Sequence, residues 1–165
     1  MHFIADGYNI INSDPIFSAS TLEGRRNKLF EFILNKRPHG SLNNTIAVVF
    51  DFKGDNPYQI GGWNRSFYKE IEVIFSGGRE IADDIITELV DNAKNPSQIT
   101  VVTNDKGIWR RIGGSGAKRI NVEDFISKGN GSKNKKIAEY AVKAAFANKD
   151  KINEEFEKLW LSKQK

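Results

Sequence analysis

Short apolar runs, each closed or closely followed by an aspartate, constrain the fold of this chain more than any other feature. They lie at residues 3–5, 46–50, 71–75 and 99–103. Runs this short are typical of buried parallel strands, and the segments between several of them have helical periodicity. Strands that alternate with helices favour a parallel sheet with right-handed crossovers. We therefore predict an α/β fold with a mostly parallel central sheet of about five strands flanked by helices.

The boundaries of the expected elements follow from capping and turn residues. The signature Ser20-Thr21-Leu22-Glu23 starts a helix that continues toward Lys36. A Gly-, Asn- and Pro-rich stretch, 52–67, predicts a long loop. The expected strands are residues 2–6, 46–51, 71–75, 99–103 and 119–122. We expect one globular domain over 1–127, and then a basic linker and C-terminal helices over 128–165.

Four aspartates fall at the same kind of boundary. Asp6 and Asp51 close the first two strands, Asp105 follows the 99–103 strand, and Asp83 opens the helix after 71–75. Any one of them could simply cap the next helix. Four together favour a shared pocket, because ligands of open α/β sheets bind outside the carboxyl ends of the strands. Clustered carboxylates repel one another without a cation, so the pattern indicates a divalent metal, Mg²⁺ or Mn²⁺.

The composition excludes several other chemistries. The chain of 165 residues has no Cys and only two His, which excludes disulfides, thiolate metal sites and a Cys nucleophile, and disfavours a His-rich zinc site. No apolar stretch reaches the roughly 20 residues of a membrane span. With no signal-like segment at its start, the chain is expected to be cytoplasmic, without a membrane partner.

Positive charge gathers toward the end of the chain. From Lys128 onward there are 10 Lys and no Arg against 5 acidic residues. A near-neutral body with a basic tail suits a polyanion such as RNA, although a Lys-rich helical tail can also be merely solvated. The class of RNA, whether mRNA, tRNA or rRNA, does not follow from the charge.

Several motifs resemble the YacP-like branch of the NYN domains, which belong to the PIN-like nucleases. The resemblance covers about residues 2–127, and its motifs occur at 4–11, 48–51, 72–76, 80–84, 101–105 and 116–119. It implies a PIN-like (NYN) three-layer fold and metal-dependent endoribonuclease activity. One member of this branch is a ribosome-associated endoribonuclease, so the ribosome enters here as an expected partner.

The resemblance also implies roles for individual residues. It places Asp6, Asp51, Asp83 and Asp105 in a catalytic metal site, with Glu80 as a fifth acid beside them. Further residues are expected to contact substrate, and these are Asn9, Arg26, Arg79, Asn104, Lys106 and Trp63. Asn104 could equally stabilise a turn. Each cation could contact phosphate, which Arg can hold with two hydrogen bonds, or it could be a solvated surface charge.

Other interpretations of the same residues stay open at this point. A non-catalytic RNA-binding or adaptor module would keep the fold, but it would gain nothing from acids that repel phosphates. A flap-type DNA nuclease has a similar acidic site, yet its longer helical elements are not evident. A phosphatase of the haloacid-dehalogenase type requires Asp-x-Asp, and here the sequence is Asp6-Gly7-Tyr8.

Overall fold

The computed structural model describes residues 1–52, 63–77 and 81–131. The strands are β1 (His2–Asp6), β2 (Thr45–Phe50), β3 (Asn64–Tyr68), β4 (Ile71–Phe75), β5 (Ile99–Val102) and β6 (Lys118–Ile120). The helices are α1 (Gly7–Ser13), α2 (Leu22–Lys36), α3 (Ala82–Asp91) and α4 (Lys106–Arg111), with short 3-10 turns at Pro15–Phe17, Pro96–Gln98 and Ile112–Gly114. A last helix covers residues 122–131.

In the described part of the chain, one sheet carries all six strands in the order β3-β4-β2-β1-β5-β6. Every neighbouring pair is parallel except β3 and β4, which form an antiparallel hairpin at one edge. This confirms the predicted α/β fold with a mostly parallel central sheet. Because β1, β2, β4 and β5 run in the same direction, their carboxyl ends meet at one edge of the sheet.

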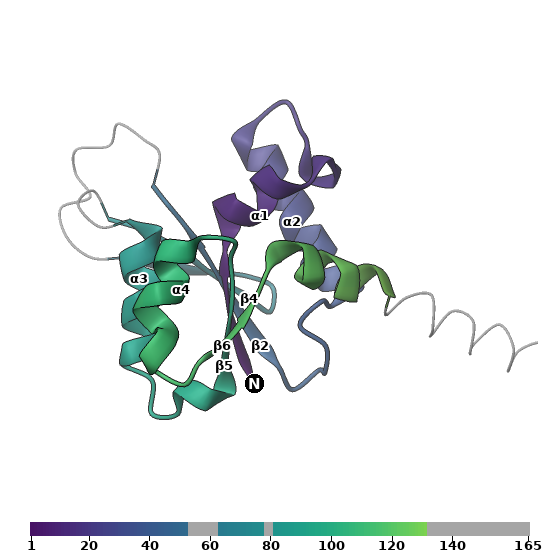
Figure 1. The fold of residues 1–165 in the computed structure, drawn as a ribbon. Coiled ribbons are helices and arrows are strands. Elements are labelled where there is room, and N and C mark those ends of the chain that lie inside the picture. The colour runs from purple at the N-terminus through teal and green to yellow at the C-terminus, as the bar shows by residue number, and fades with distance from the viewer. Residues whose placement is uncertain (53–62, 78–80, 132–165) are drawn as a thin grey trace, which may run out of the picture. The chain divides into compact units, whose positions relative to one another are not determined.

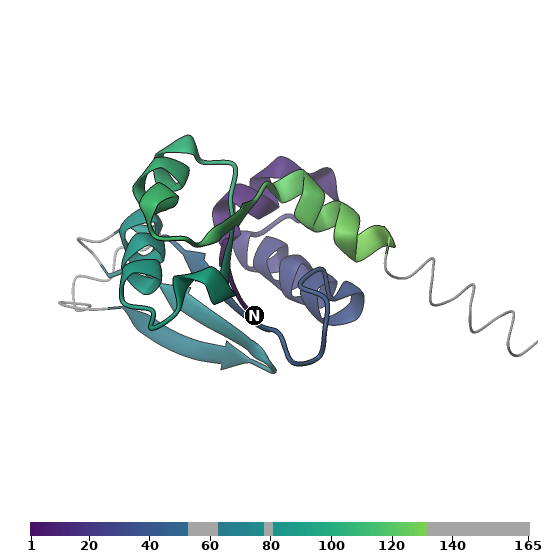
Figure 2. The same ribbon diagram turned by 60° about the horizontal axis from the view of Figure 1, so that its bottom comes forward.

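Helices cover both faces of the sheet (Figures 1 and 2). Alternate residues of β1 enter different cores: Phe3 packs with α1, α2 and the last helix, whereas Ile4 packs with α3 and α4. In both views α1 and α2 lie on the side opposite α3 and α4. The near-continuous burial of β1, β2 and β5 explains why these strands appear in the sequence as short apolar runs.

The structure corrects the expected loop over 52–67 and adds a strand to the expected five. Residues 64–68 form β3, and a turn at Lys69, whose φ is 54°, returns the chain into β4. The sequence pattern fails here because β3 is an exposed edge strand in which only Tyr68 is partly buried. Residues 53–62 of the expected loop, Tyr58 among them, lie outside the described residues.

The end of the described chain also differs from expectation. Asn121 starts the last helix by accepting a hydrogen bond from the Asp124 amide at 2.7 Å. The helix continues through 128–131, where a linker was expected. The chain divides into two compact units, Met1–Gly129 and Asn130–Lys165. Within the described part of the chain, no helix has the length and apolar character that crossing a bilayer requires.

Candidate acidic site

Two of the predicted aspartates cap the helices that follow their strands. Asp6 ends β1, and its Oδ1 accepts a hydrogen bond from the Asn9 amide at 3.0 Å in α1. Asp105 precedes α4 and accepts from the amides of Gly107 and Ile108. The capping explanation therefore holds for both residues. It leaves room for a further role, because capping uses only one oxygen, Oδ1, of each carboxylate.

The other two aspartates meet at the start of α3. Asp51 follows β2, and its Oδ1 accepts from the Ala82 amide at 2.6 Å. The residue at the N-cap position of α3, Ile81, offers no side-chain hydrogen bond, so Asp51 supplies the missing acceptor from another part of the chain. Asp83 lies in the first turn of α3, where the helix dipole favours a negative charge.

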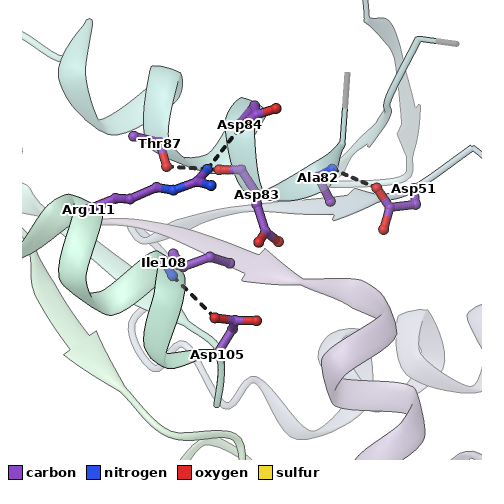
Figure 3. A network of polar contacts seen from close by, with 8 residues as sticks. All are labelled: Asp51, Ala82, Asp83, Asp84, Thr87, Asp105, Ile108 and Arg111. Atoms are coloured by element: carbon purple, nitrogen blue, oxygen red, sulfur yellow. Dashed lines mark hydrogen bonds and ion pairs between the residues drawn. The ribbon is translucent and has the colours of Figure 1, made fainter. Parts of the chain in front are cut away.

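An open hollow of about 410 Å³ lies at the carboxyl edge of the sheet. Three of the four aspartates line it, and the described residues of its lining are Asp6, Tyr8, Asn9, Asn12, Ser13, Asp51, Asp83 and Asn104. Asp105 does not line the hollow, but it is near: in Figure 3 the Asp83 carboxylate lies between those of Asp51 and Asp105. The structure thus brings together residues that are up to 98 positions apart in the sequence, from Asp6 to Asn104.

Burial and neighbouring acids raise the pKa of two of the aspartates, Asp6 and Asp83. Burial raises the pKa of Asp6 to about 6; the hydrogen bonds from the Asn9 amide and the Thr103 hydroxyl oppose this rise, and the charges of Asp83 and Asp51 add to it. The pKa of Asp83 is also raised, first by burial and then by Asp105, while Arg111 opposes the rise and Asp51 and Asp84 add to it. Both shifts have the sign expected for carboxyl groups that are withdrawn from water and lie beside other acids.

The donor set suits a hard cation, although the carboxylates do not close around one position. Among the described residues, no group of three or more His, Cys, Asp or Glu side chains is close enough to hold a metal ion directly. Mg²⁺ commonly uses only one or two carboxylates and keeps several of its waters. An open hollow lined by Asp6, Asp51 and Asp83 leaves room for the waters of such an ion, so it fits a partly hydrated ion better than a fully dehydrated one.

Asn9 and Asn104 tie the hollow to the last helix. Asn9 accepts from the Asn104 amide at 3.0 Å. The Asn104 side chain donates to Glu123 at 2.8 Å and accepts from the Val122 amide at 2.9 Å. Both asparagines line the hollow, but the polar atoms of the Asn104 side chain are already engaged. Its geometry therefore favours the structural alternative of the two that the sequence left open.

Arg26 lies away from the hollow, in an aromatic environment. Its guanidinium donates to the Tyr8 hydroxyl and lies 5.0–5.4 Å from the ring centres of Tyr8, Phe50 and Phe75. Arg26 lines a different hollow, formed by α2 and the β3–β4 hairpin. Among the described residues, its contact with the lining of the acidic hollow is the one with Tyr8. This contact favours positioning of Tyr8 over direct contact with substrate.

The remaining predicted residues are scattered. Lys106 is exposed on the first turn of α4, next to Asp105. Trp63 precedes β3, packs partly against the core, and has the Arg65 guanidinium 5.1 Å from its ring centre. Glu80 and Arg79 lie outside the described residues.

Sequence reasoning missed two polar residues beside the acids. The buried Thr103 donates to Asp6 at 3.1 Å and accepts from the Asp105 amide at 3.0 Å, so it links two of the aspartates. Arg111 pairs with Asp84 at 2.7 Å (Figure 3), and its charge opposes the rise in the pKa of Asp83. Thr103 could have been found from its position directly before the Asn104-Asp105 motif, whereas the reach of Arg111 across to α3 depends on the tertiary fold.

Comparison with known proteins assigns the chain to a family of this fold. The model of the YacP-like NYN domain matches residues 3–165, which includes the tail beyond the motifs. The crystal structure of Rae1 (YacP) from Bacillus subtilis is 25% identical, with a TM-score of 0.60, and the match covers 96% of this chain and 93% of that one. A crystal structure of a mutant of the same Bacillus subtilis protein is also 25% identical, with a TM-score of 0.62, 81% of this chain covered and 77% of the other. Comparison with curated protein sequences gives no match.

Proposed function

Because the chain belongs to the YacP-like NYN domain family, within the PIN-like nucleases, we propose that it is a metal-dependent endoribonuclease. The observation that carries the proposal is the hollow at the carboxyl edge, lined by Asp6, Asp51 and Asp83. A pure binding module would gain nothing from this arrangement, since the neighbouring carboxylates add to the raised pKa of Asp6 and of Asp83 and repel phosphate.

The proposed chemistry needs a cation that the carboxylates hold. Mg²⁺ or Mn²⁺ would polarise a phosphoryl oxygen and activate water for an in-line displacement at the phosphodiester. Asp83 and Asp51 are the proposed principal ligands, because they share the hollow and their charges act on each other. Asp6 is deeper, at 8% exposure, and keeps its orientation through Asn9 and Thr103. Asp105 adds negative charge next to Asp83.

Uncharged groups around the acids would position the RNA. Asn12 and Ser13 line the hollow with Asn9, so amide and hydroxyl groups surround the carboxylates on the α1 side. Tyr8 is also in the lining and is held by Arg26 from behind. These groups can hydrogen-bond phosphate or ribose without adding further negative charge.

An adjacent pair of aspartates provides a matched test. Asp83 lines the hollow, whereas Asp84 is the next residue of α3, is exposed, and pairs with Arg111. Purified wild type, Asp83→Asn and Asp84→Asn proteins would be incubated with labelled single-stranded RNA, structured RNA and DNA in Mg²⁺, Mn²⁺ or EDTA. We expect metal-dependent RNA cleavage by wild type and Asp84→Asn, and a loss of at least about 100-fold in Asp83→Asn.

Each other outcome has a definite meaning. Equal cleavage by the two variants would point to a contaminating nuclease and contradict the proposed site. RNA binding without cleavage in any metal would favour the non-catalytic module, and preferential cleavage of DNA would favour the flap-type alternative. The ribosome is proposed as a partner from the family resemblance alone, and co-sedimentation with ribosomes, followed by cleavage of ribosome-bound mRNA, tests it.

A further inference from the structure

A run of cations without any acid begins directly after the acidic site. Between Asp105 and Glu123 the chain has five basic residues and no acidic one, the basic residues being Lys106, Arg110, Arg111, Lys118 and Arg119. The first three belong to α4, and the last two belong to β6, which forms one edge of the sheet. This grouping differs from the Lys-rich tail, because it lies within the folded unit and on defined elements.

A second and larger hollow adjoins part of this run. It has a volume of about 770 Å³, and Phe3 and Thr100, from the first halves of β1 and β5, contribute to its lining. Ile120 and Asn121, at the carboxyl end of β6, also line it, so the hollow follows the edge of the sheet that β6 forms and shares no lining residue with the acidic hollow. Among the described residues, the charged side chains that line it are three cations and one carboxylate, namely Lys118, Arg119, Lys128 and Asp124. We call this hollow the basic groove.

The three cations of the basic groove differ in their surroundings: Arg119 is held by Trp109, whereas Lys118 and Lys128 are exposed to solvent. Arg119 donates to the Trp109 carbonyl at 3.2 Å, and its guanidinium lies 5.8 Å from the centre of the Trp109 ring. Lys118 and Lys128 are exposed, and within the described residues neither forms an ion pair. Free cations beside a preorganised arginine are the arrangement expected for a polyanion.

Helix α4 connects the basic groove to the acidic hollow. Asp105 caps its start at the acidic edge, and Trp109, about one helical turn later, lines the groove. Lys106 and Arg110 are exposed on the same helix. Lys106 and Arg110 thus carry positive charge along α4 toward the groove, whereas Arg111 of the same helix is paired with Asp84.

We propose that the basic groove binds the phosphate backbone of single-stranded RNA at a distance from the bond that the acidic hollow cleaves. This inference rests on the proposed function, since it assigns the RNA of that reaction a second contact. A compact anion would need a closed pocket, whereas cations spread along a strand, a helix and an open groove match the repeating charge of a nucleic-acid backbone. The groove would serve affinity and orientation, and the carboxylates would serve cleavage.

The test compares two double variants that each remove two positive charges. The groove variant, Lys118→Gln with Lys128→Gln, changes the basic groove. The control variant, Lys28→Gln with Lys69→Gln, changes α2 and the turn between β3 and β4. Strand β3 forms the edge of the sheet opposite to β6. Binding of fluorescent single-stranded RNA of about 20 nucleotides would be measured by anisotropy in EDTA, where no metal-dependent cleavage occurs. Thermal unfolding would confirm that both variants are folded.

The groove variant is expected to bind about 10-fold more weakly near 0.1 M salt, and the slope of log K against log salt should fall by about 1.4. The control variant should match wild type. Lys118→Arg with Lys128→Arg keeps the charge and should keep the affinity.

Equal weakening of binding in the groove and control variants would overturn the proposal, because the contribution would then be general net charge. Unchanged binding in the groove variant would overturn it as well. Neither result affects the nuclease proposal, which depends on cleavage and on Asp83. Conversely, weaker binding of the long RNA by the groove variant would support the groove even if no cleavage were found.

Discussion

Replacing Asp6 with Asn should stabilise the protein in the absence of metal while abolishing its proposed activity. Asp6 is buried at 8% exposure, and its pKa rises from the ordinary 3.8 to about 6. A raised carboxyl pKa means that the folded state resists ionisation of this group. The ionised form, which the proposed chemistry requires, therefore destabilises the fold at neutral pH.

The size of the effect follows from that shift and from two hydrogen bonds. A rise of about 2.2 pKa units corresponds to about 3 kcal/mol of destabilisation at pH 8. Asn keeps an acceptor for the Asn9 amide, but it loses the acceptor for the Thr103 hydroxyl, which costs about 1 kcal/mol. The net gain for Asp6→Asn is about 2 kcal/mol, or about 4–8 °C in melting temperature for a chain of this size.

Urea unfolding of wild type and Asp6→Asn in EDTA, at pH 8 and at pH 4, measures this gain. Above pH 6 the wild-type carboxylate is ionised in both states, and the folded state carries the full cost. As the pH falls from about 6 toward 4, Asp6 becomes protonated first in the folded state, so the advantage of the variant should disappear. A variant less stable than wild type at pH 8, or a gain that does not change with pH, would refute the reasoning.

Three further changes test other parts of the structure. Burial, followed by the nearby Arg37, lowers the pKa of His39 to about 4. The free energy of unfolding of wild type should therefore fall by about 2–3 kcal/mol relative to that of His39→Gln between pH 7 and pH 4.5. The same pH dependence of the unfolding free energy in both proteins would contradict this. Gly7→Ala would place a Cβ 2.2 Å from the Phe50 ring and should cost about 2–3 kcal/mol in urea unfolding, so an unchanged midpoint would show that the ring can move. Asp51→Asn keeps an acceptor for the start of α3 and should be about 1 kcal/mol more stable than Asp51→Ala, unless another group caps that helix.

The buried strands were predictable because their chemistry is local. The apolar runs of β1, β2, β4 and β5 appear directly in the sequence, since these strands are buried on both faces. Strand β3 could not be found in this way, because it is exposed and pairs through the backbone with β4. The last helix was missed because β6 before it is only three residues long. Apolar residues of the helix, such as Phe125, therefore come close to those of the strand in the sequence, and the boundary between the two is hard to see.

The candidate site divides in a similar way. Parallel strands bring their carboxyl ends together. The meeting of Asp6, Asp51 and Asp83 could therefore be inferred from their positions at or after the ends of the apolar runs. The surroundings of Arg26 depend on which aromatic rings lie on the face of the sheet that α2 covers, and the spacing of residues in the sequence does not show this. The ion pair between Arg111 and Asp84 likewise depends on α3 and α4 lying side by side.

Titration of the protein with Mn²⁺, followed by NMR of the backbone amides, tests the central claim most directly. Mn²⁺ is paramagnetic and broadens the signals of nearby amides, so binding in the acidic hollow should broaden those of Asn9, Ala82 and Asn104 first. The same titration should leave these signals sharp in Asp83→Asn and broaden them in Asp84→Asn. No broadening in wild type, or broadening confined to other parts of the surface, would contradict a metal-dependent site in the hollow.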